Sequence, residues 1–306
     1  MKVIFDLYGT GLGNNGGSRT LSLCAETIAE LGHDVSIFSN VKSKYTWHKI
    51  DKKVKQIGGE NMPKCDVAIS TSPKSVKHTV RCKAKRKFYY IRGYEIFWCS
   101  EKLVHSGYKK LRCIVNSEWL QRKLASLGVD SDIVYPGLDF DLFSKIVDPV
   151  KRFDIIGGLY HKKLKTKNHS HVEKVSSMLN DGLLMLNKDI SSPSPDALRS
   201  FYNKIKVWMA PTELEGLHNP PMEASLCGCG LVATDHGMSG MSDYAKHLDT
   251  ALVYPAGDLK LASEYVNTLM KDHGLREELN NNMVELLREK IGSRQENMKK
   301  MLEIIS

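Results

Sequence analysis

Short apolar runs alternate with helix-like patterns along the whole chain, and this alternation constrains the fold more than any other feature. Lys2–Tyr8 has the pattern of a strand, Ser18–Leu31 carries apolar residues at helical spacing, and Asp34–Phe38 is a second strand. Strands that alternate with helices form a mostly parallel sheet, because each helical crossover returns the chain to the same edge. The sequence therefore predicts an α/β fold.

The alternation continues in two series, which predicts two domains. Further strands are expected at 67–70, 88–92, 112–116 and 133–135, and then at 153–158, 183–186, 206–210, 231–234 and 251–254. Helices are expected at 118–127, 171–179, 195–202, 221–226 and from 259 onward, ending in the amphipathic segment 294–305. We expect two facing Rossmann-like domains, residues 1–147 and 148–306, with a ligand cleft between them and a last helix able to pack back on the first domain.

Positive charge is concentrated in the first half of the chain. Residues 1–150 hold 24 Lys and Arg against 15 Asp and Glu, whereas residues 151–306 hold 20 of each kind. The densest stretch runs from Lys74 to Lys87. This asymmetry indicates that the first domain faces an anionic partner, although a solvated face that keeps the protein soluble would also explain it.

The expected location follows from what the sequence lacks. No apolar run approaches the length of a membrane span, and the first residues do not have the layout of a signal peptide. We expect a cytoplasmic protein whose basic first domain can contact a membrane surface peripherally.

A glycine-rich loop, Gly11 to Gly16, follows the first strand and precedes the first helix. Its G-x-G-x-x-G spacing is typical of NAD(P)-binding domains, where glycines let the backbone approach a pyrophosphate. That fingerprint also needs a carboxylate at the end of the second strand, and this strand ends in Ser39-Asn40. The remaining interpretations are a phosphate- or sugar-binding loop at Gly16-Gly17, or turn glycines without a ligand.

Two carboxylates, Glu215 and Glu223, lie on either side of a turn that follows a predicted strand. Pro220-Pro221 suits the first turn of a helix, and Asn219 can cap it. Both glutamates then lie at the carboxyl edge of the sheet, where open α/β sheets bind ligands. Carboxylates accept hydrogen bonds from sugar and ribose hydroxyls, and the backbone N–H groups of Gly216–Asn219 can hold further oxygens.

The surrounding sequence resembles the retaining GT-B glycosyltransferases of family 4, within the glycosyl transferases of group 1. The resemblance rests on Glu215-Gly216-Leu217-His218-Asn219-Pro220-Pro221-Met222-Glu223-Ala224, which is similar to the family's E-x7-E motif. It extends to the segments 116–120, 134–143, 201–211, 231–235 and 254–258, and to Gly16-Gly17 in the first loop. The resemblance therefore covers most of the chain.

This resemblance implies a hexosyltransferase-type enzyme that moves a sugar from a nucleotide sugar to a glycan or lipid-linked acceptor with retention. It implies that Glu223 binds the nucleotide ribose and that Glu215 and the turn Gly216, Leu217, His218 and Asn219 contact the donor sugar. It further implies that Lys167, with Lys163 as a second candidate, grips the diphosphate, since a fixed cation stabilises the leaving group. The nucleotide sugar is a co-substrate, no cofactor is implied, and no paired-aspartate metal site is present in the sequence.

The chain also departs from the family pattern. His218 stands where the family has a glycine, so it either binds a sugar hydroxyl or shields the turn. Arg92 and Glu95 follow a predicted strand of the first domain and are structural or acceptor-side candidates. Among anionic partners, a lipid-linked glycan or an acidic polysaccharide suits the basic first domain better than nucleic acid does. The alternative functions are a sugar-nucleotide or glycan-binding module that has lost transfer and, ranked below it, an NAD(P)-dependent Rossmann enzyme.

Overall fold

The computed structural model describes residues 1–146, 154–161, 164–187, 194–235 and 237–306. The chain divides into two compact units. The first unit comprises Met1–Gly137 and Arg294–Ser306, and the second comprises Leu138–Ser293. The boundary expected at residues 147 and 148 lies outside the described residues.

The first unit is built on a parallel sheet. Among its described residues the sheet has seven strands in the order β3-β2-β1-β4-β5-β6-β7. The strands are β1 (Lys2–Asp6), β2 (Asp34–Ser39), β3 (Val54–Gly58), β4 (Cys65–Ser70), β5 (Ala84–Ile91), β6 (Arg112–Val115) and β7 (Ser131–Ile133). Strand order reverses between β1 and β4, so the loops that follow these two strands meet at one edge of the sheet.

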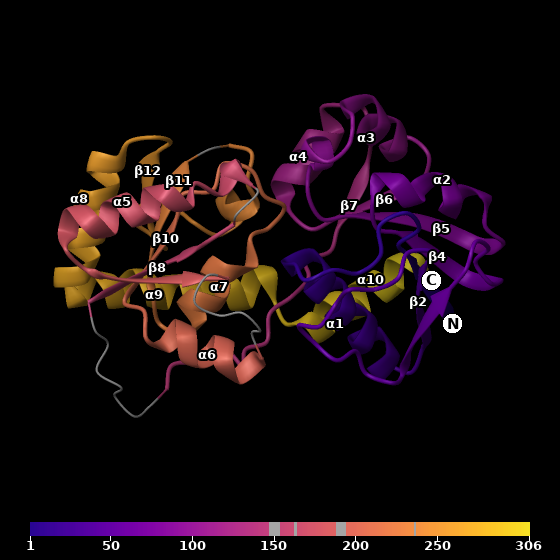
Figure 1. Cartoon of the computed structure of the whole chain (residues 1–306), viewed down its shortest axis with the longest axis horizontal. Helices are drawn as coiled ribbons and strands as arrows, with labels where there is room; N and C mark the ends of the chain where they lie inside the picture. Colours follow the sequence, from indigo (N-terminus) through magenta and orange to yellow (C-terminus); the bar gives the residue numbers. More distant parts are fainter. Residues whose placement is uncertain (147–153, 162–163, 188–193, 236) are drawn as a thin grey trace. The chain divides into compact units, whose positions relative to one another are not determined.

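Helices cover both faces of this sheet (Figure 1). They are α1 (Gly16–Glu30), α2 (Pro73–Arg81), α3 (Glu101–Tyr108), α4 (Glu118–Ala125) and α10 (Arg294–Ile305), with the short 3-10 turn η1 (Glu95–Phe97). α1 and α10 pack together on one face, and α2 and α3 pack side by side on the other. Met298, Met301 and Ile305 of α10 are buried in the same apolar core as Val3 and Phe5 of β1.

The second unit has its own parallel sheet, with the described strands in the order β12-β11-β10-β8-β9. The strands are β8 (Ile155–Leu159), β9 (Gly182–Leu186), β10 (Val207–Ala210), β11 (Gly230–Asp235) and β12 (Leu252–Pro255). The helices are α5 (His169–Leu179), α6 (Pro195–Asn203), α7 (Asn219–Leu226), α8 (Leu259–Lys271) and α9 (His273–Leu286), with 3-10 turns η2 (Lys165–Lys167) and η3 (Gly240–Asp243) and a π-helical turn, Leu287–Ile291. The expectation of an α/β fold with two parallel sheets is confirmed.

Close packing within the second unit depends on a glycine pair in β8. A Cβ atom at Gly157 would lie 2.5 Å from Ile205 Cδ1 and 2.9 Å from the ring of Trp208, and one at Gly158 would lie 2.8 Å from Val172. These distances are shorter than van der Waals contact, so only glycine lets the buried Trp208 ring lie against the strand.

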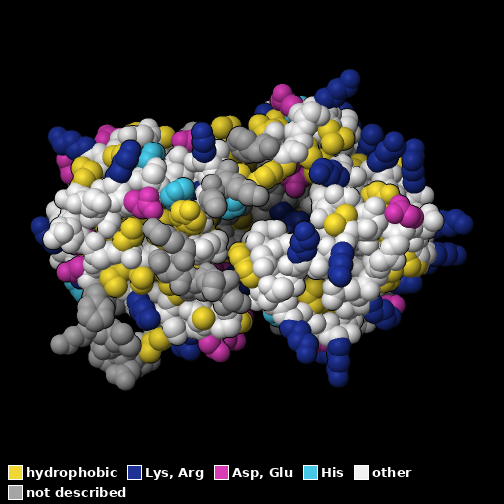
Figure 2. Space-filling model, in the orientation of Figure 1, with side chains coloured by type: hydrophobic (Ala, Val, Ile, Leu, Met, Phe, Trp, Pro, Cys, Tyr) yellow, Lys and Arg dark blue, Asp and Glu magenta, His cyan; other side chains and the backbone are white. Residues whose placement is uncertain are grey.

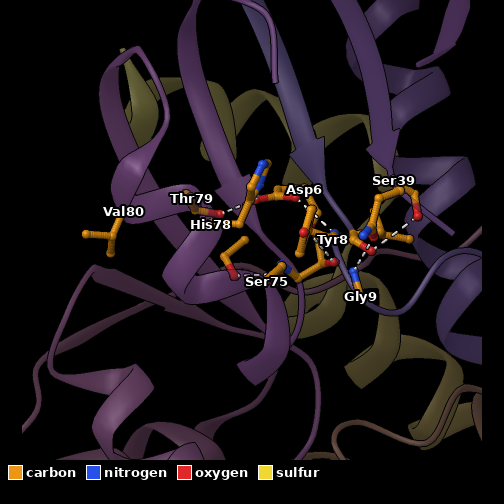
Figure 3. A network of polar contacts seen from close by, with 12 residues as sticks. Asp6, Tyr8, Gly9, Ser39, Ser75, His78, Thr79 and Val80 are labelled. Carbon is orange, nitrogen blue, oxygen red and sulfur yellow. Dashed lines mark hydrogen bonds and ion pairs between the residues drawn. The ribbon is translucent and has the colours of Figure 1, made fainter. Parts of the chain in front are cut away.

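A buried polar network ties β1 of the first unit to α2 (Figure 3). Asp6 is fully buried at the end of β1. Its carboxylate accepts hydrogen bonds from the Tyr8 backbone N–H at 3.0 Å, from the Thr79 hydroxyl at 2.7 Å and from His78 Nδ1 at 2.8 Å. The His78 ring also stacks on Tyr8, with 4.3 Å between ring centroids. The network fixes the start of the loop that leads to α1.

We expect Asp6→Ala to lower the free energy of unfolding by about 3–5 kcal/mol, because it leaves the buried Thr79 hydroxyl and the partly buried His78 ring without their acceptor. Urea denaturation measures the change. The matched control is Asp34→Ala, which removes an exposed ion pair with Lys55 and costs less than about 1 kcal/mol. Equal effects of the two substitutions would show that the Asp6 network stabilises the first unit no more than an exposed ion pair does.

Candidate functional site

Two loops of the second unit meet at the carboxyl edge of its sheet. β8 and β10 are hydrogen-bonded neighbours, and strand order reverses between them. The loop after β8 contains η2, and the loop after β10 leads through residues 211–218 into α7. Such a switch point is where open parallel sheets bind ligands.

Asn168 ties these two loops together. Its backbone is left-handed, with φ of 46°, which asparagine tolerates better than most residues. Its side-chain amide donates to the Pro211 carbonyl at 3.0 Å and to Glu213 Oε1 at 2.8 Å. The Glu213 backbone N–H donates to the Thr166 carbonyl at 2.9 Å in return. These bonds fix the position of the intervening residue, Lys167.

Lys167 and Glu215 form a buried ion pair. The Lys167 side chain is 9% exposed and the Glu215 side chain is 20% exposed, and the ammonium contacts Glu215 Oε1 directly. Burial lowers the pKa of Lys167 to about 7, whereas the adjacent carboxylate favours the charged form. The structure thus brings together the two residues for which the sequence predicted catalytic roles.

His218 lies beside this pair. Its Nε2 atom is 3.7 Å from Glu215 Oε1, and the side chain is almost fully buried. The residue is the N-cap of α7 and has a left-handed backbone, with φ of 67°. The expectation that Asn219 caps the helix is wrong, because Asn219 is already the first helical residue. Pro220 and Pro221 lack N–H groups, so the first turn needs fewer capping acceptors.

The turn that carries His218 is held by residues from a loop far along the chain. The Tyr244 hydroxyl donates to the His218 carbonyl at 2.9 Å, and the Gly240 N–H donates to the Gly216 carbonyl at 2.9 Å. A Cβ atom at Gly240 would collide with the backbone of Gly216 and Leu217. Sequence reasoning did not identify these supports, since no local pattern links residues 240–244 to the turn.

Glu223 projects from α7 and is 5% exposed. The Tyr202 hydroxyl, on α6, donates to Glu223 Oε2 at 3.0 Å. Tyr202 therefore orients the second carboxylate of the motif. Tyr202 lies in a segment that resembles the family, but its pairing with Glu223 depends on how α6 and α7 pack, so no local pattern reveals its role.

The site residues predicted in the first unit lie at the start of α1 and in the segment that follows β5. Gly16 is the first residue of α1, and the Asn15 side chain caps that helix by accepting from the Ser18 N–H. Arg92 donates to the Gly17 carbonyl, and to the Thr71 carbonyl at 3.4 Å. Arg92 thus joins the first turn of α1 to the loop that follows β4.

Glu95 lies in η1, close to Arg92. The Tyr89 hydroxyl donates to Glu95 Oε2 at 3.2 Å. Burial raises the pKa of Glu95 to about 7, and the Arg92 charge and the Tyr89 hydrogen bond oppose this rise. A carboxyl group with such a pKa can exchange a proton near neutrality.

Two candidates of the second unit remain, Leu217 and Lys163. Leu217, within the turn, is buried, and Lys163 lies outside the described residues. Within the described ranges, no three His, Cys, Asp or Glu side chains come close enough together to hold a metal ion. In that same part of the chain, every helix is too short or too polar to cross a membrane.

Part of the chain matches a family of known proteins. Residues 142–285 match the family model described as glycosyl transferases group 1. The capsular polysaccharide biosynthesis glycosyltransferase CapM of Staphylococcus aureus is 28% identical over 119 residues. That alignment covers 39% of this chain and 30% of CapM, so it spans less than a third of the relative's length.

Solved structures match over the whole chain. Sucrose-phosphate synthase from Thermosynechococcus elongatus has a TM-score of 0.82 at 12% identity, with 99% of this chain and 98% of that chain covered. Anabaena HepE in complex with UDP-glucose has a TM-score of 0.77 at 12% identity, covering 100% and 99%. WaaG, a glycosyltransferase of lipopolysaccharide biosynthesis, has a TM-score of 0.69 at 11% identity, covering 99% of each chain.

At such low identities these structures show the fold, which is the GT-B fold, with a parallel α/β sheet in each unit. The family match lies entirely within the second unit, where it includes Lys167, Glu215, His218 and Glu223. The family match and the GT-B fold together support a glycosyltransferase of group 1.

Proposed function

We propose that the chain transfers a sugar from a nucleoside-diphosphate sugar to a glycan or lipid-linked acceptor, with retention at the anomeric carbon and without a metal ion. The observation that carries the proposal is the buried pair of Lys167 and Glu215 at the switch point of the second sheet. A buried ammonium at such an edge suits a diphosphate, and buried carboxylates suit sugar and ribose hydroxyls.

The donor is proposed to lie along the carboxyl edge of the second unit. Glu223, oriented by Tyr202, accepts from the ribose hydroxyls, and Glu215 lies near the donor sugar. HepE has been solved with UDP and with UDP-glucose, which makes uridine-diphosphate sugars the first donors to test.

The proposed reaction breaks the bond between the anomeric carbon and the β-phosphate oxygen, and the nucleoside diphosphate leaves with the electron pair. The acceptor hydroxyl attacks from the same face, and its proton passes to the departing phosphate oxygen. Lys167 opposes the charge that develops on that oxygen, which is the role a metal ion has in other transferases. We accordingly expect chelation with EDTA to leave turnover unchanged.

Glu215→Gln tests the assignment. We expect it to slow release of UDP from UDP-glucose by about 100-fold or more, because it removes the charge beside the reacting sugar while keeping the side-chain shape. Thermal unfolding with UDP should still show binding. Glu264→Gln, on the exposed face of α8, serves as the control and should leave both readouts unchanged. Full turnover in Glu215→Gln would refute the catalytic role.

The pH dependence tests Lys167. Burial lowers its pKa to about 7, so the functional ammonium is lost as pH rises through that value. We expect kcat/KM for UDP-glucose, whose diphosphate stays doubly charged in the neutral range, to decline above pH 7 by up to about tenfold per pH unit. Lys167→Arg should lose this decline at a lower absolute rate, because arginine stays protonated. The same alkaline decline in both proteins would assign it to another group.

The partner of the first unit is proposed to be an anionic membrane surface that presents the acceptor, with the protein on the cytoplasmic side. A basic strip runs over α2 to the start of β5, and the sequence has no Asp or Glu from residue 67 to residue 94. The strip comprises the exposed residues Lys74, Lys77, Arg81, Lys83 and Arg86. Figure 2 shows Lys and Arg side chains along this edge of the unit.

Exposed apolar side chains favour a lipid surface over a soluble polyanion. Trp98 is 61% exposed between η1 and α3, Leu103 on α3 is 40% exposed, and Val80 on α2 is 39% exposed. Tryptophan and leucine beside lysines are typical of protein surfaces that lie on a bilayer. Lipid headgroups would meet the cations while these apolar groups enter the interface.

We expect the triple change Lys74→Gln, Lys77→Gln and Arg81→Gln to weaken binding to phosphatidylglycerol vesicles by roughly a hundredfold, since each cation near an anionic surface contributes about 1 kcal/mol. Vesicle co-sedimentation measures this. The control triple Lys52→Gln, Lys53→Gln and Lys299→Gln changes the net charge equally and should have a smaller effect. Equal loss in both triples, or equal binding to phosphatidylcholine vesicles, would contradict a specific docking surface.

A further inference from the structure

The backbone of His218 is in a conformation that favours glycine. Its φ of 67° and ψ of 77° place it in the left-handed region, which is energetically unfavourable for most residues other than glycine. A glycine would hold the same turn without this cost. The imidazole is therefore present at an energetic cost that the turn itself does not require.

The ring is held in one orientation by the residues around it. His218 Nδ1 lies 3.3 Å from Met241 Sδ, and the Tyr244 hydroxyl fixes the His218 carbonyl. A thioether sulfur carries no hydrogen, so the ring nitrogen must donate in this contact. Burial, together with the nearby Lys167 charge, lowers the pKa of His218 well below its ordinary value, so the ring is neutral. The neutral ring thus carries its proton on Nδ1.

This tautomer leaves Nε2 as a hydrogen-bond acceptor without a partner. The side chain is buried, and among the described residues no donor reaches Nε2. Its polar neighbour at 3.7 Å is Glu215 Oε1, which is itself an acceptor. A buried acceptor left unpaired has lost its hydrogen bonds to water without replacement, so a donor group from a ligand would be bound favourably here.

We propose that His218 Nε2 accepts a hydrogen bond from one hydroxyl of the donor sugar and thereby selects donors by the configuration of that hydroxyl. This inference rests on the proposed transferase function and adds a specificity-determining residue to it. The ligand group at Nε2 is a hydroxyl and not a phosphate, because an ionised phosphate has no hydrogen to donate. Its oxygens would face two other acceptors, His218 Nε2 and the Glu215 carboxylate. A sugar whose hydroxyl points elsewhere would leave Nε2 unpaired in a closed site.

The experiment compares the wild type, His218→Gly and His218→Asn by release of UDP from UDP-glucose, UDP-galactose and UDP-xylose, and by release of GDP from GDP-mannose. Glycine and asparagine both tolerate the left-handed backbone, so the turn and α7 are expected to fold in both variants. We expect the ratio of kcat/KM between the best and the next-best sugar to fall by about tenfold or more in His218→Gly. The affinity for UDP alone should change less than twofold.

Binding is measured alongside turnover, by thermal unfolding with UDP and with the preferred UDP-sugar. The added stabilisation from the sugar should shrink in both variants, while that from UDP stays constant. An unchanged sugar preference in His218→Gly would overturn the inference and leave the transferase function standing. Absence of turnover and of nucleotide binding in the wild type, with every donor, would instead refute the proposed function and this inference with it.

Discussion

The candidate site of the second unit depends on one buried ion pair. Lys167 comes from the loop after β8 and Glu215 from the loop after β10, and their contact joins two loops that are far apart in sequence. Removing both charges from water costs several kcal/mol, which the pair alone recovers only in part. The hydrogen bonds of Asn168 and the packing of the 216–218 turn hold the two side chains in place. The site is therefore organised before any ligand arrives, at a cost in stability.

The arrangement of strands could be largely predicted from the sequence, because buried parallel strands read as short continuous apolar runs. β3, α2 and α3 were not predicted, for a physical reason in each case. Only Val54 is buried in the edge strand β3. The buried face of α2 consists of Pro73, Ser75, Val76 and Thr79, so this helix shows no apolar stripe, and the eight-residue α3 buries only Val104, Gly107 and Tyr108. Periodicity cannot detect a helix that packs through small and polar residues.

The site was predictable only as far as the local motif reaches. The spacing of Glu215 and Glu223 and the proline pair place both carboxylates at the carboxyl edge, and the structure agrees. The partners that orient them could not be predicted. Tyr202, Met241 and Tyr244 reach the motif through tertiary packing, and the left-handed backbone at His218 follows from contacts with the 238–244 segment. Sequence identifies which groups are present at a site, and tertiary contacts decide which way they face.

The chain path has a consequence for how the protein is made. The second unit is inserted between two segments of the first, and α10 is synthesised only after the whole of that insertion. Yet Met298, Met301 and Ile305 of α10 complete the core around β1 and α1. During translation, the apolar core of the first unit therefore stays incomplete and partly exposed until the second unit has been synthesised. Synthesis of the first unit begins before that of the second but ends after it. The incomplete first unit is therefore the species for which a chaperone would be needed.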